Sequence, residues 1–102
     1  MSSKVRRPGR PAGEIFPLSA AGMGDTGVIV RVGGEADLAT VARSELERRL
    51  LEMGFVEGAR IRVLHEGFIG RDPIAVQLDD MRIALRRREA ADVMVQSLAN
   101  DD

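Results

Sequence analysis

Hydrophobic and polar residues alternate regularly through the second half of the chain. Residues 60–66, 74–78 and 81–85 place apolar side chains at every second position, the period of a strand with one buried face. The connections at 67–73 and 79–80 are too short for crossover helices, so we expect neighbouring strands to be antiparallel. The first is interpreted as a hairpin loop and the second as a tight turn. The pattern predicts a small, strongly bent antiparallel β-barrel of the SH3-like kind.

Further strands and a short helical turn complete this mainly β domain. Residues 26–32 alternate between two faces and end at a Gly-Gly pair, and residues 94–96 can return to the sheet as a closing strand. Residues 86–93 are charged and then alanine-rich, which fits a single helical turn. We therefore expect one domain over residues 17–96, with one or two short helices.

The main helix is predicted over residues 45–53, and an earlier start near Asp37 is equally compatible with the composition. Ser44 and Glu47 have the spacing of a capping box, in which the two side chains satisfy unpaired backbone donors at a helix start. At about 100° per residue, three apolar side chains share one face and should meet the core. They are Leu46, Leu50 and Met53.

The end of this helix gives the predicted interaction site. Gly54 occupies the position after the helix where the chain takes a positive φ, and Phe55 can then fold back onto Leu50 or Leu51. Leu51 lies off the apolar face and is predicted to be the most exposed large aliphatic residue. We expect Leu51 and Phe55 to contact a protein partner, with Gly54 and Gly58 shaping the turn.

Both ends of the chain differ in composition from the domain. Residues 1–16 combine proline, glycine and serine with four cations and little apolar surface, which predicts a disordered basic tail. Within it, Gly9-Arg10-Pro11 is similar to arms that bind the minor groove of DNA, an alternative to a plain solubilising tail. Residues 97–102 are predicted to form a polar C-terminal tail.

The composition of the chain argues against several classes of function. The chain has 102 residues, no cysteine and a net charge of -1, with mixed charges along the domain and therefore no basic footprint for duplex nucleic acid. Only three aromatic residues are present, so the stacking of bases is not expected. No apolar run approaches the roughly 20 residues that span a bilayer, and no signal peptide is evident. We expect a soluble protein of the reducing cytoplasm.

Chemistry-bearing residues are sparse. His65 is the one histidine, and its neighbour Glu66 should point to the opposite face of the strand. A residue on the surface or rim of the barrel is the simpler interpretation of His65. An adventitious or intersubunit metal ligand and a general base are the alternatives, and a homo-oligomer is left open. Asp72, Asp79 and Asp80 are interpreted as turn residues because their spacing lacks the pattern of a calcium loop. We predict no catalytic residues and no enzyme activity, and the metal site is unknown, with His65 a weak candidate.

Four ordered motifs occur between residues 17 and 96. Residues 50–58 read L-x-x-M-G-F-x-x-G, residues 70–76 read G-R-D-P-I-A-V, and residues 83–91 contain I-A-L-R followed by E-A-A. Upstream, residues 18–30 contain a leucine, spaced glycines and a valine run. In this order the motifs resemble the FeoA family, small cytosolic proteins of bacterial ferrous iron transport. Departures are the arginine at position 71, the longer segment 33–44 and the N-terminal tail.

The resemblance implies an SH3-like barrel that acts as an accessory or regulatory protein of ferrous iron transport. Its implied partner is the cytosolic part of a FeoB-like membrane GTPase and permease, through which it would be peripheral to the membrane. No cofactor is firmly implied, and Fe(2+) or another divalent transition metal remains open as a ligand. The alternative is a divalent-metal-responsive regulatory domain, because similar domains end metal-dependent repressors.

Overall fold

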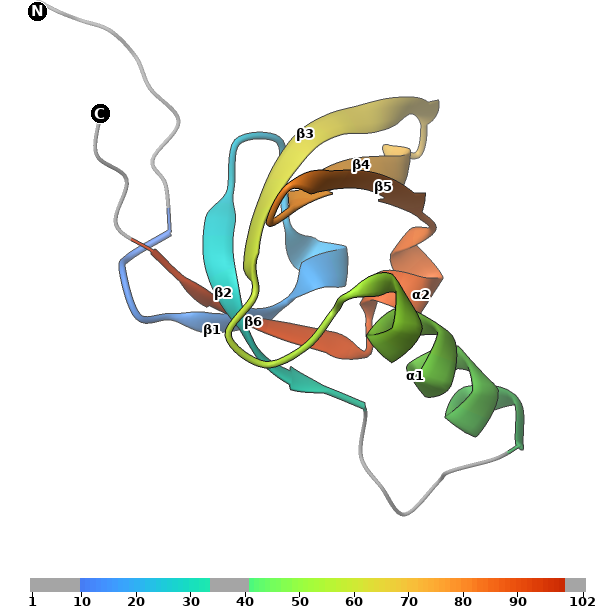
Figure 1. Cartoon of the computed structure of the whole chain (residues 1–102). Coiled ribbons are helices and arrows are strands. Elements are labelled where there is room, and N and C mark those ends of the chain that lie inside the picture. Colours follow the sequence, from blue (N-terminus) through green and yellow to red (C-terminus); the bar gives the residue numbers. More distant parts are fainter. Residues whose placement is uncertain (1–9, 34–40, 99–102) are drawn as a thin grey trace, which may run out of the picture.

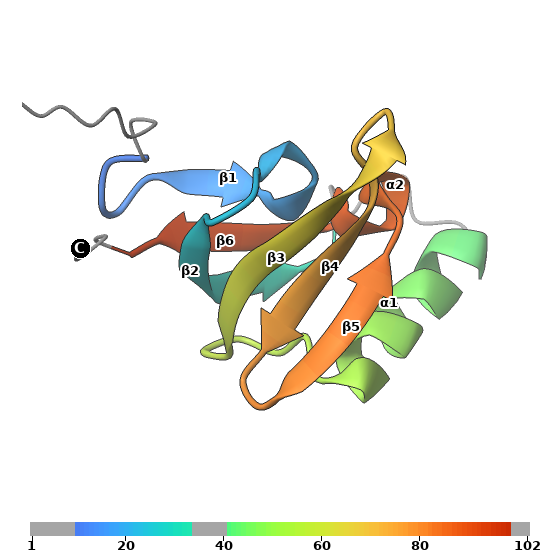
Figure 2. The ribbon, with the colours of Figure 1, turned by 90° about the horizontal axis from the view of Figure 1, so that it is seen from above.

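The computed structural model describes residues 10–33 and 41–98. Within these residues, six strands form one antiparallel sheet in the order β1-β6-β2-β3-β4-β5 (Figure 1). Seen from above, β1 and β6 run across the direction of β3, β4 and β5, and β2 joins the two parts (Figure 2). The strands are β1 Ile15–Pro17, β2 Thr26–Val32, β3 Arg60–Ile69, β4 Asp72–Leu78, β5 Met81–Leu85 and β6 Val93–Ser97.

Two α-helices and one 3-10 turn, η1, accompany the sheet in the described part of the chain. Helix α1 covers Val41–Met53, α2 covers Arg87–Ala90 and η1 covers Leu18–Ala20. Helix α1 lies beside the sheet near β5, and α2 packs against η1 (Figure 2). The predicted mainly β architecture with short helices is confirmed.

The core fills the concave side of the sheet with aliphatic side chains and two phenylalanines, Phe16 and Phe55. Strands β3 and β4 contribute alternate residues, as the period of two predicted. Helix α1 contributes the buried Leu50, with Leu46 and Met53 packed against the core, so the predicted helical face is confirmed. The buried aliphatic residues of the sheet include Ile29, Ile61, Val63, Ile74, Val76, Leu78, Leu85, Val93 and Val95.

Register shifts bend the sheet into its curled shape. One lies in β2 between Ile29 and Arg31, and another lies in β3 between Val63 and His65. An extra residue in one strand of an antiparallel pair increases the local twist and bends the strand. These bulges let a single sheet curl around a small core.

The start of α1 differs from the predicted capping box. Ser44 is the fourth residue of α1, and a capping residue must be non-helical, so this prediction is wrong. The earlier start near Asp37 lies outside the described residues. A bond of the capping-box kind occurs at α2, where the Arg86 N–H donates to Glu89 Oε1 over 2.9 Å. The Ser-x-x-Glu spacing alone did not identify a helix start, because helical residues already precede it.

Residues at both ends of the described chain that were assigned to tails belong to the sheet. Residues 15–17 form β1, which pairs with β6, and Phe16 is buried, so assigning residues 10–16 to a disordered tail is wrong. At the other end, Ser97 is a buried residue of β6, and the Leu98 N–H donates to the Thr26 carbonyl over 3.2 Å. Strand β1 has too few residues to show a period and exists through its pairing with β6. Residues 1–9 and 99–102 lie outside the described part of the chain.

The segment predicted as the loop 67–73 is mostly strand. Strand β3 continues to Ile69 and pairs it with Asp72, the first residue of β4. Gly70 and Arg71 form the two-residue connection with φ of 66° and 58°, the positive values that a tight hairpin turn of type I′ uses. The hairpin is therefore longer than the alternating pattern indicated.

Candidate functional site

The turn after α1 is a complete helix-ending motif. Gly54 has a φ of 109°, a region that costs residues with a side chain strain energy. The Gly54 N–H donates to the Leu51 carbonyl and the Phe55 N–H donates to the Leu50 carbonyl, each over 3.0 Å. These two bonds define a Schellman motif, which satisfies carbonyls left open at the helix end. The predicted helix stop at Gly54 is confirmed.

The same turn is bonded to the barrel. The Gly58 N–H donates to the Ile29 carbonyl over 2.8 Å, and the Ile29 N–H donates to the Ala59 carbonyl over 2.9 Å. The Ala59 N–H donates to the Val56 carbonyl over 3.0 Å, which closes the turn itself. The turn after α1 is thus held on β2 by backbone bonds.

Three exposed apolar side chains surround Gly54, and we call them the helix-turn patch: Leu51, Val56 and Met81. Their exposed fractions are 48%, 44% and 49%. The Val56 N–H donates to the Gly54 carbonyl over 2.8 Å, and a Cβ built on Gly54 would lie 3.5 Å from Met81 Cε. The predicted exposure of Leu51 is confirmed. The patch therefore combines residues of α1, of the turn after it and of β5.

Phe55 does not belong to the patch. Its side chain is 0% exposed and lies in the core, so the prediction of an exposed contact is wrong. In a Schellman motif, the residue after the glycine commonly packs against the helix residue that accepts its N–H. That residue is Leu50, which is also buried. The fold-back that the sequence predicted for Phe55 therefore places the ring inside the barrel.

A second apolar surface lies at the other end of β4. Phe68 is 103% exposed and Ile69 is 86% exposed, and we call this pair the hairpin tip. The prediction that Leu51 is the most exposed large aliphatic residue is wrong, because Ile69 exceeds it. An aromatic and a β-branched residue directly before a glycine-containing dipeptide are typical of a strand entering a tight turn. That signal was available in the sequence, but the predicted strand ended at residue 66.

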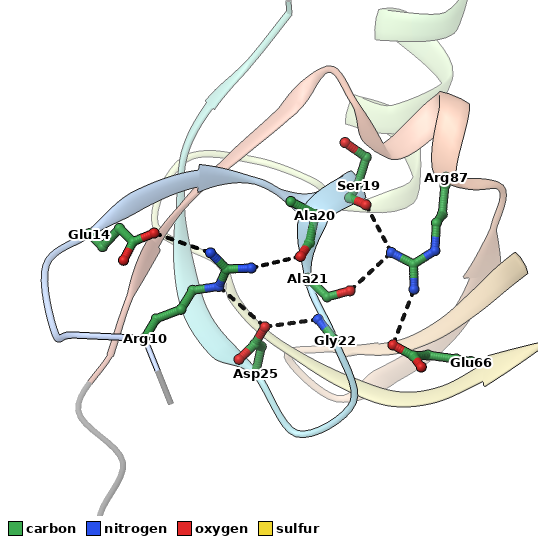
Figure 3. A network of polar contacts seen from close by, with 9 residues as sticks. All are labelled: Arg10, Glu14, Ser19, Ala20, Ala21, Gly22, Asp25, Glu66 and Arg87. Carbon is green, nitrogen blue, oxygen red and sulfur yellow. Dashed lines mark hydrogen bonds and ion pairs between the residues drawn. The ribbon is translucent and has the colours of Figure 1, made fainter. Parts of the chain in front are cut away.

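Arg87 joins the hairpin that carries the tip to residues 19–21, and its contacts with Ser19, Ala21 and Glu66 are shown in Figure 3. Its guanidinium is largely buried, with 16% side-chain exposure, and its backbone N–H donates to Asp72 Oδ1 over 2.8 Å. A fork of donors of this kind suits several acceptors at fixed angles. Arg87 donates to the carbonyls of Ser19 (2.8 Å), Ala21 (2.9 Å) and Arg71 (2.7 Å) and to Glu66 Oε2 (3.2 Å). The sequence analysis missed this residue because its partners are distant in the chain.

Arg10 likewise binds several acceptors from separate segments, near β1 (Figure 3). Its guanidinium contacts Glu14 Oε2 at 3.1 Å, Asp25 Oδ2 at 3.3 Å and the Ala20 carbonyl at 2.6 Å. It also lies 3.9 Å above the centre of the Phe16 ring. Because these contacts occupy the guanidinium within the fold, the alternative of an extended arm for the minor groove is wrong at Arg10.

His65 lies exposed on β3, opposite Ala75, as predicted for a surface residue. Glu66 is directed elsewhere and pairs with Arg87, so the two neighbours do not form a joint ligand site. Across residues 10–33 and 41–98, no group of three or more His, Cys, Asp or Glu side chains could hold a metal ion. His65 as a metal ligand stays a prediction. None of the described helices is both long and apolar enough to cross a membrane.

Comparison with known proteins identifies the domain. Residues 16–97 match the model of the FeoA domain. A Fe(2+) transport protein A/Fe(2+) transporter FeoB fusion protein of Porphyromonas gingivalis is 37% identical over 84 residues, which are 82% of this chain. The chain spans only 9% of the length of that fusion protein.

Solved structures agree in fold. The zinc complex of FeoA from Stenotrophomonas maltophilia, described as a prokaryotic SH3 domain protein, is 32% identical with a TM-score of 0.65. The match covers 79% of this chain and 89% of that one. A manganese-dependent transcriptional repressor is 26% identical with a TM-score of 0.67, and the match covers 86% of this chain and 44% of the repressor.

The SH3-like barrel predicted from alternation is thus confirmed by fold and by structural likeness. The family match extends from Phe16 in β1 to Ser97 in β6 and includes every described strand, apart from the first residue of β1. The chain belongs to the FeoA family, small accessory proteins of ferrous iron transport.

Proposed function

We propose that this protein is cytosolic and supports ferrous iron uptake by binding the cytosolic part of a FeoB-type membrane GTPase and permease. The relative from Porphyromonas gingivalis supports this pairing, because in it an iron transport protein A and a FeoB transporter form one polypeptide. Fusion of two chains keeps their domains at high effective concentration, which is useful when the domains work in contact. The FeoA of Stenotrophomonas maltophilia has been put forward as an activating factor of bacterial ferrous iron transport.

The observation that carries the proposal is the helix-turn patch around Gly54. Leu51, Val56 and Met81 are each about half exposed, so they are ready to be covered by a partner without rearrangement. The Schellman bonds and the bonds to β2 fix the backbone beneath them. A rigid apolar patch loses little conformational entropy on binding, and a few such anchors supply most of the affinity of an interface.

We propose an accessory role without catalysis. The chain has no cysteine, and its histidine lies on the exposed face of β3. The adjacent carboxylate of Glu66 is held by Arg87 at 3.2 Å and is not directed at that imidazole. The described residues therefore provide no partner that would orient His65 as a general base.

Leu51→Ala is the variant that tests the patch. Truncation of an anchor that a partner desolvates commonly costs about 2 kcal/mol, or roughly thirtyfold in affinity. We expect the melting midpoint to stay nearly unchanged, because Leu51 is half exposed. Iron uptake by cells and co-purification with the transporter from membranes should both fall.

Ile15→Ala is the matched control. Ile15 is 55% exposed and lies on β1, at the opposite edge of the sheet from β5 and its patch residue Met81. It loses similar apolar area and should leave uptake and co-purification at the level of the unmodified protein. Normal uptake in folded Leu51→Ala would show that the docking surface lies elsewhere, and equal losses in both variants would show that the effect is not specific to the patch.

A metal-responsive regulatory domain is the second candidate function. It is favoured by the likeness to the manganese-dependent repressor, of which the match covers 44%. Such a role requires this chain to bind a divalent ion at useful affinity, and a metal titration separates the two candidates.

A further inference from the structure

The hairpin tip exposes apolar side chains on adjacent residues. Phe68 and Ile69 are the last two residues of β3 before the turn at Gly70, and the register of β3 against β4 shifts between Glu66 and Ile69. Their exposed fractions of 103% and 86% show that no described part of the chain covers either one. Figure 2 shows the end of this hairpin projecting beyond the neighbouring strands. Lipid can surround an uncovered apolar tip that projects from the fold.

Cations surround the tip. Arg71 is exposed at the turn itself, and its carbonyl accepts the Arg87 Nε–H over 2.7 Å, which places the start of α2 beside the turn. Arg86 and Arg88, on either side of Arg87, are also exposed. The turn and the start of α2 therefore bring three exposed arginines to this end of the hairpin.

The acidic residues at this end already have partners. Glu66 pairs with Arg87 at 3.2 Å, and Asp72 accepts the backbone N–H of Arg87. Glu89 accepts the Arg86 N–H and pairs with Arg49 at 3.5 Å. These contacts direct the carboxylates inward or along the surface, and the positive charge of Arg71, Arg86 and Arg88 faces solvent.

We propose that the hairpin tip is a membrane-contact site that binds the surface of an anionic phospholipid bilayer. Phe68 and Ile69 would enter the boundary between headgroups and acyl chains, where lipid can surround both sides of the tip. Arg71, Arg86 and Arg88 would contact the headgroup phosphates. Two apolar residues with three cations give weak, reversible binding, which suits a protein that is recruited to the membrane and released. This inference goes beyond the proposed partner, since it requires lipid alone.

A tryptophan reporter at the tip tests the proposal directly. The natural chain contains no tryptophan, so Phe68→Trp creates a single fluorophore at an exposed position. With vesicles of phosphatidylglycerol and phosphatidylcholine, we expect its emission to move to shorter wavelength, because the indole leaves water for the interface. Vesicles of phosphatidylcholine alone should give a much smaller shift, and added salt should reduce the shift on the anionic vesicles.

Leu51→Trp is the control, because it places the same fluorophore on the helix-turn patch at the other end of β4. Its emission should not respond to the anionic vesicles. An unresponsive Phe68→Trp, or an equal response from both positions, would overturn the proposal. A shift of Phe68→Trp that depends on protein concentration without vesicles would assign the tip to contact with a second copy and would also overturn it.

Vesicle co-sedimentation of the full chain measures the apolar and the electrostatic contributions to binding separately. Phe68→Ser/Ile69→Ser should abolish sedimentation with anionic vesicles while the melting midpoint stays unchanged, as both side chains are exposed. Arg71→Gln should weaken binding by about fivefold, the effect of one basic residue near an anionic surface. Leu51→Ser should sediment as the unmodified protein does. Unchanged sedimentation of the double variant would refute the membrane contact.

Discussion

The helix-turn patch and the hairpin tip occupy opposite ends of β4 and are built differently. The patch contacts the core directly: Gly54 lies near Leu78 and Met81, and the residues on either side of the patch, Leu50 and Phe55, are buried. The tip extends past the core, and its strongest support is the polar cluster around Arg87. Leu51 is half covered by its own fold, whereas Phe68 is not covered at all.

This difference shows how the two surfaces depend on the fold. At the patch, helix geometry and a glycine with positive φ fix the side chains, and the core beneath holds them in place. At the tip, strand pairing carries Phe68 and Ile69 away from the barrel, and a hydrogen bond from Arg87 to the Arg71 carbonyl holds the turn. The core therefore supports the patch from beneath, whereas strand pairing and polar contacts support the tip.

Phe55 and Phe68 provide the largest contrast. Phe55 is 0% exposed and Phe68 is 103% exposed, so the same substitution tests both environments. Phe55→Ala should lower the free energy of unfolding by about 3–5 kcal/mol through lost burial and a cavity. Phe68→Ala should change it by less than about 0.5 kcal/mol. Chemical denaturation measures both, and similar values for the two variants would contradict the distinction between the core beneath the patch and the exposed tip.

Arg87 tests whether the tip is held by polar contacts. Arg87→Met retains much of the stem but leaves Glu66 and three carbonyls without their donor. We expect a loss of about 1.5–3 kcal/mol in the free energy of unfolding, the range for hydrogen bonds that involve a charged group. Amide exchange at residues 66–74 should accelerate more than exchange in α1. The exposed Arg88→Met is the control and should stay within about 0.5 kcal/mol of the unmodified protein.

Gly54 tests whether the helix stop shapes the patch. Gly54→Val forces a β-branched residue to a φ of 109° and places new atoms near Leu78 and Met81. The free energy of unfolding should fall by about 1–2 kcal/mol or more. Gly54→Asn should cost less, because asparagine accepts this backbone region more readily than valine does. If valine and asparagine gave the same melting midpoint as glycine, the positive φ would not be needed for stability.

A metal titration has the smallest expected effect. It tests whether the helix-turn patch, the hairpin tip or the sheet face between them binds a metal ion. The described residues offer no cluster of three metal-ligating side chains, and the chain has no cysteine. Anaerobic calorimetry with ferrous iron should therefore show only weak heats. A stoichiometric site of about micromolar affinity or tighter that His65→Ala removes would favour the metal-responsive function over the accessory one.

Local patterns in the sequence determined much of the barrel. The period of two located β2 to β5 because one face of each strand is buried, and the period of 3.6 placed Leu50 inward and Leu51 outward. Gly54 marked the helix end because few other residues adopt its backbone conformation. These features depend on residues close together in the chain, so the sequence alone was sufficient for them.

The features that local patterns did not predict depend on tertiary contacts. β1 has three residues and no readable period, yet pairing with β6 makes it a strand and buries Phe16. The extension of β3 to Ile69 depends on its pairing with Asp72, and the acceptors of Arg87 include Ser19 and Ala21, 68 and 66 residues away in the chain. The core position of Phe55 likewise depended on the sheet that closes over it. Hydrogen bonds and burial between distant segments form only when the sheet curls, and no local pattern records which segments will then be neighbours.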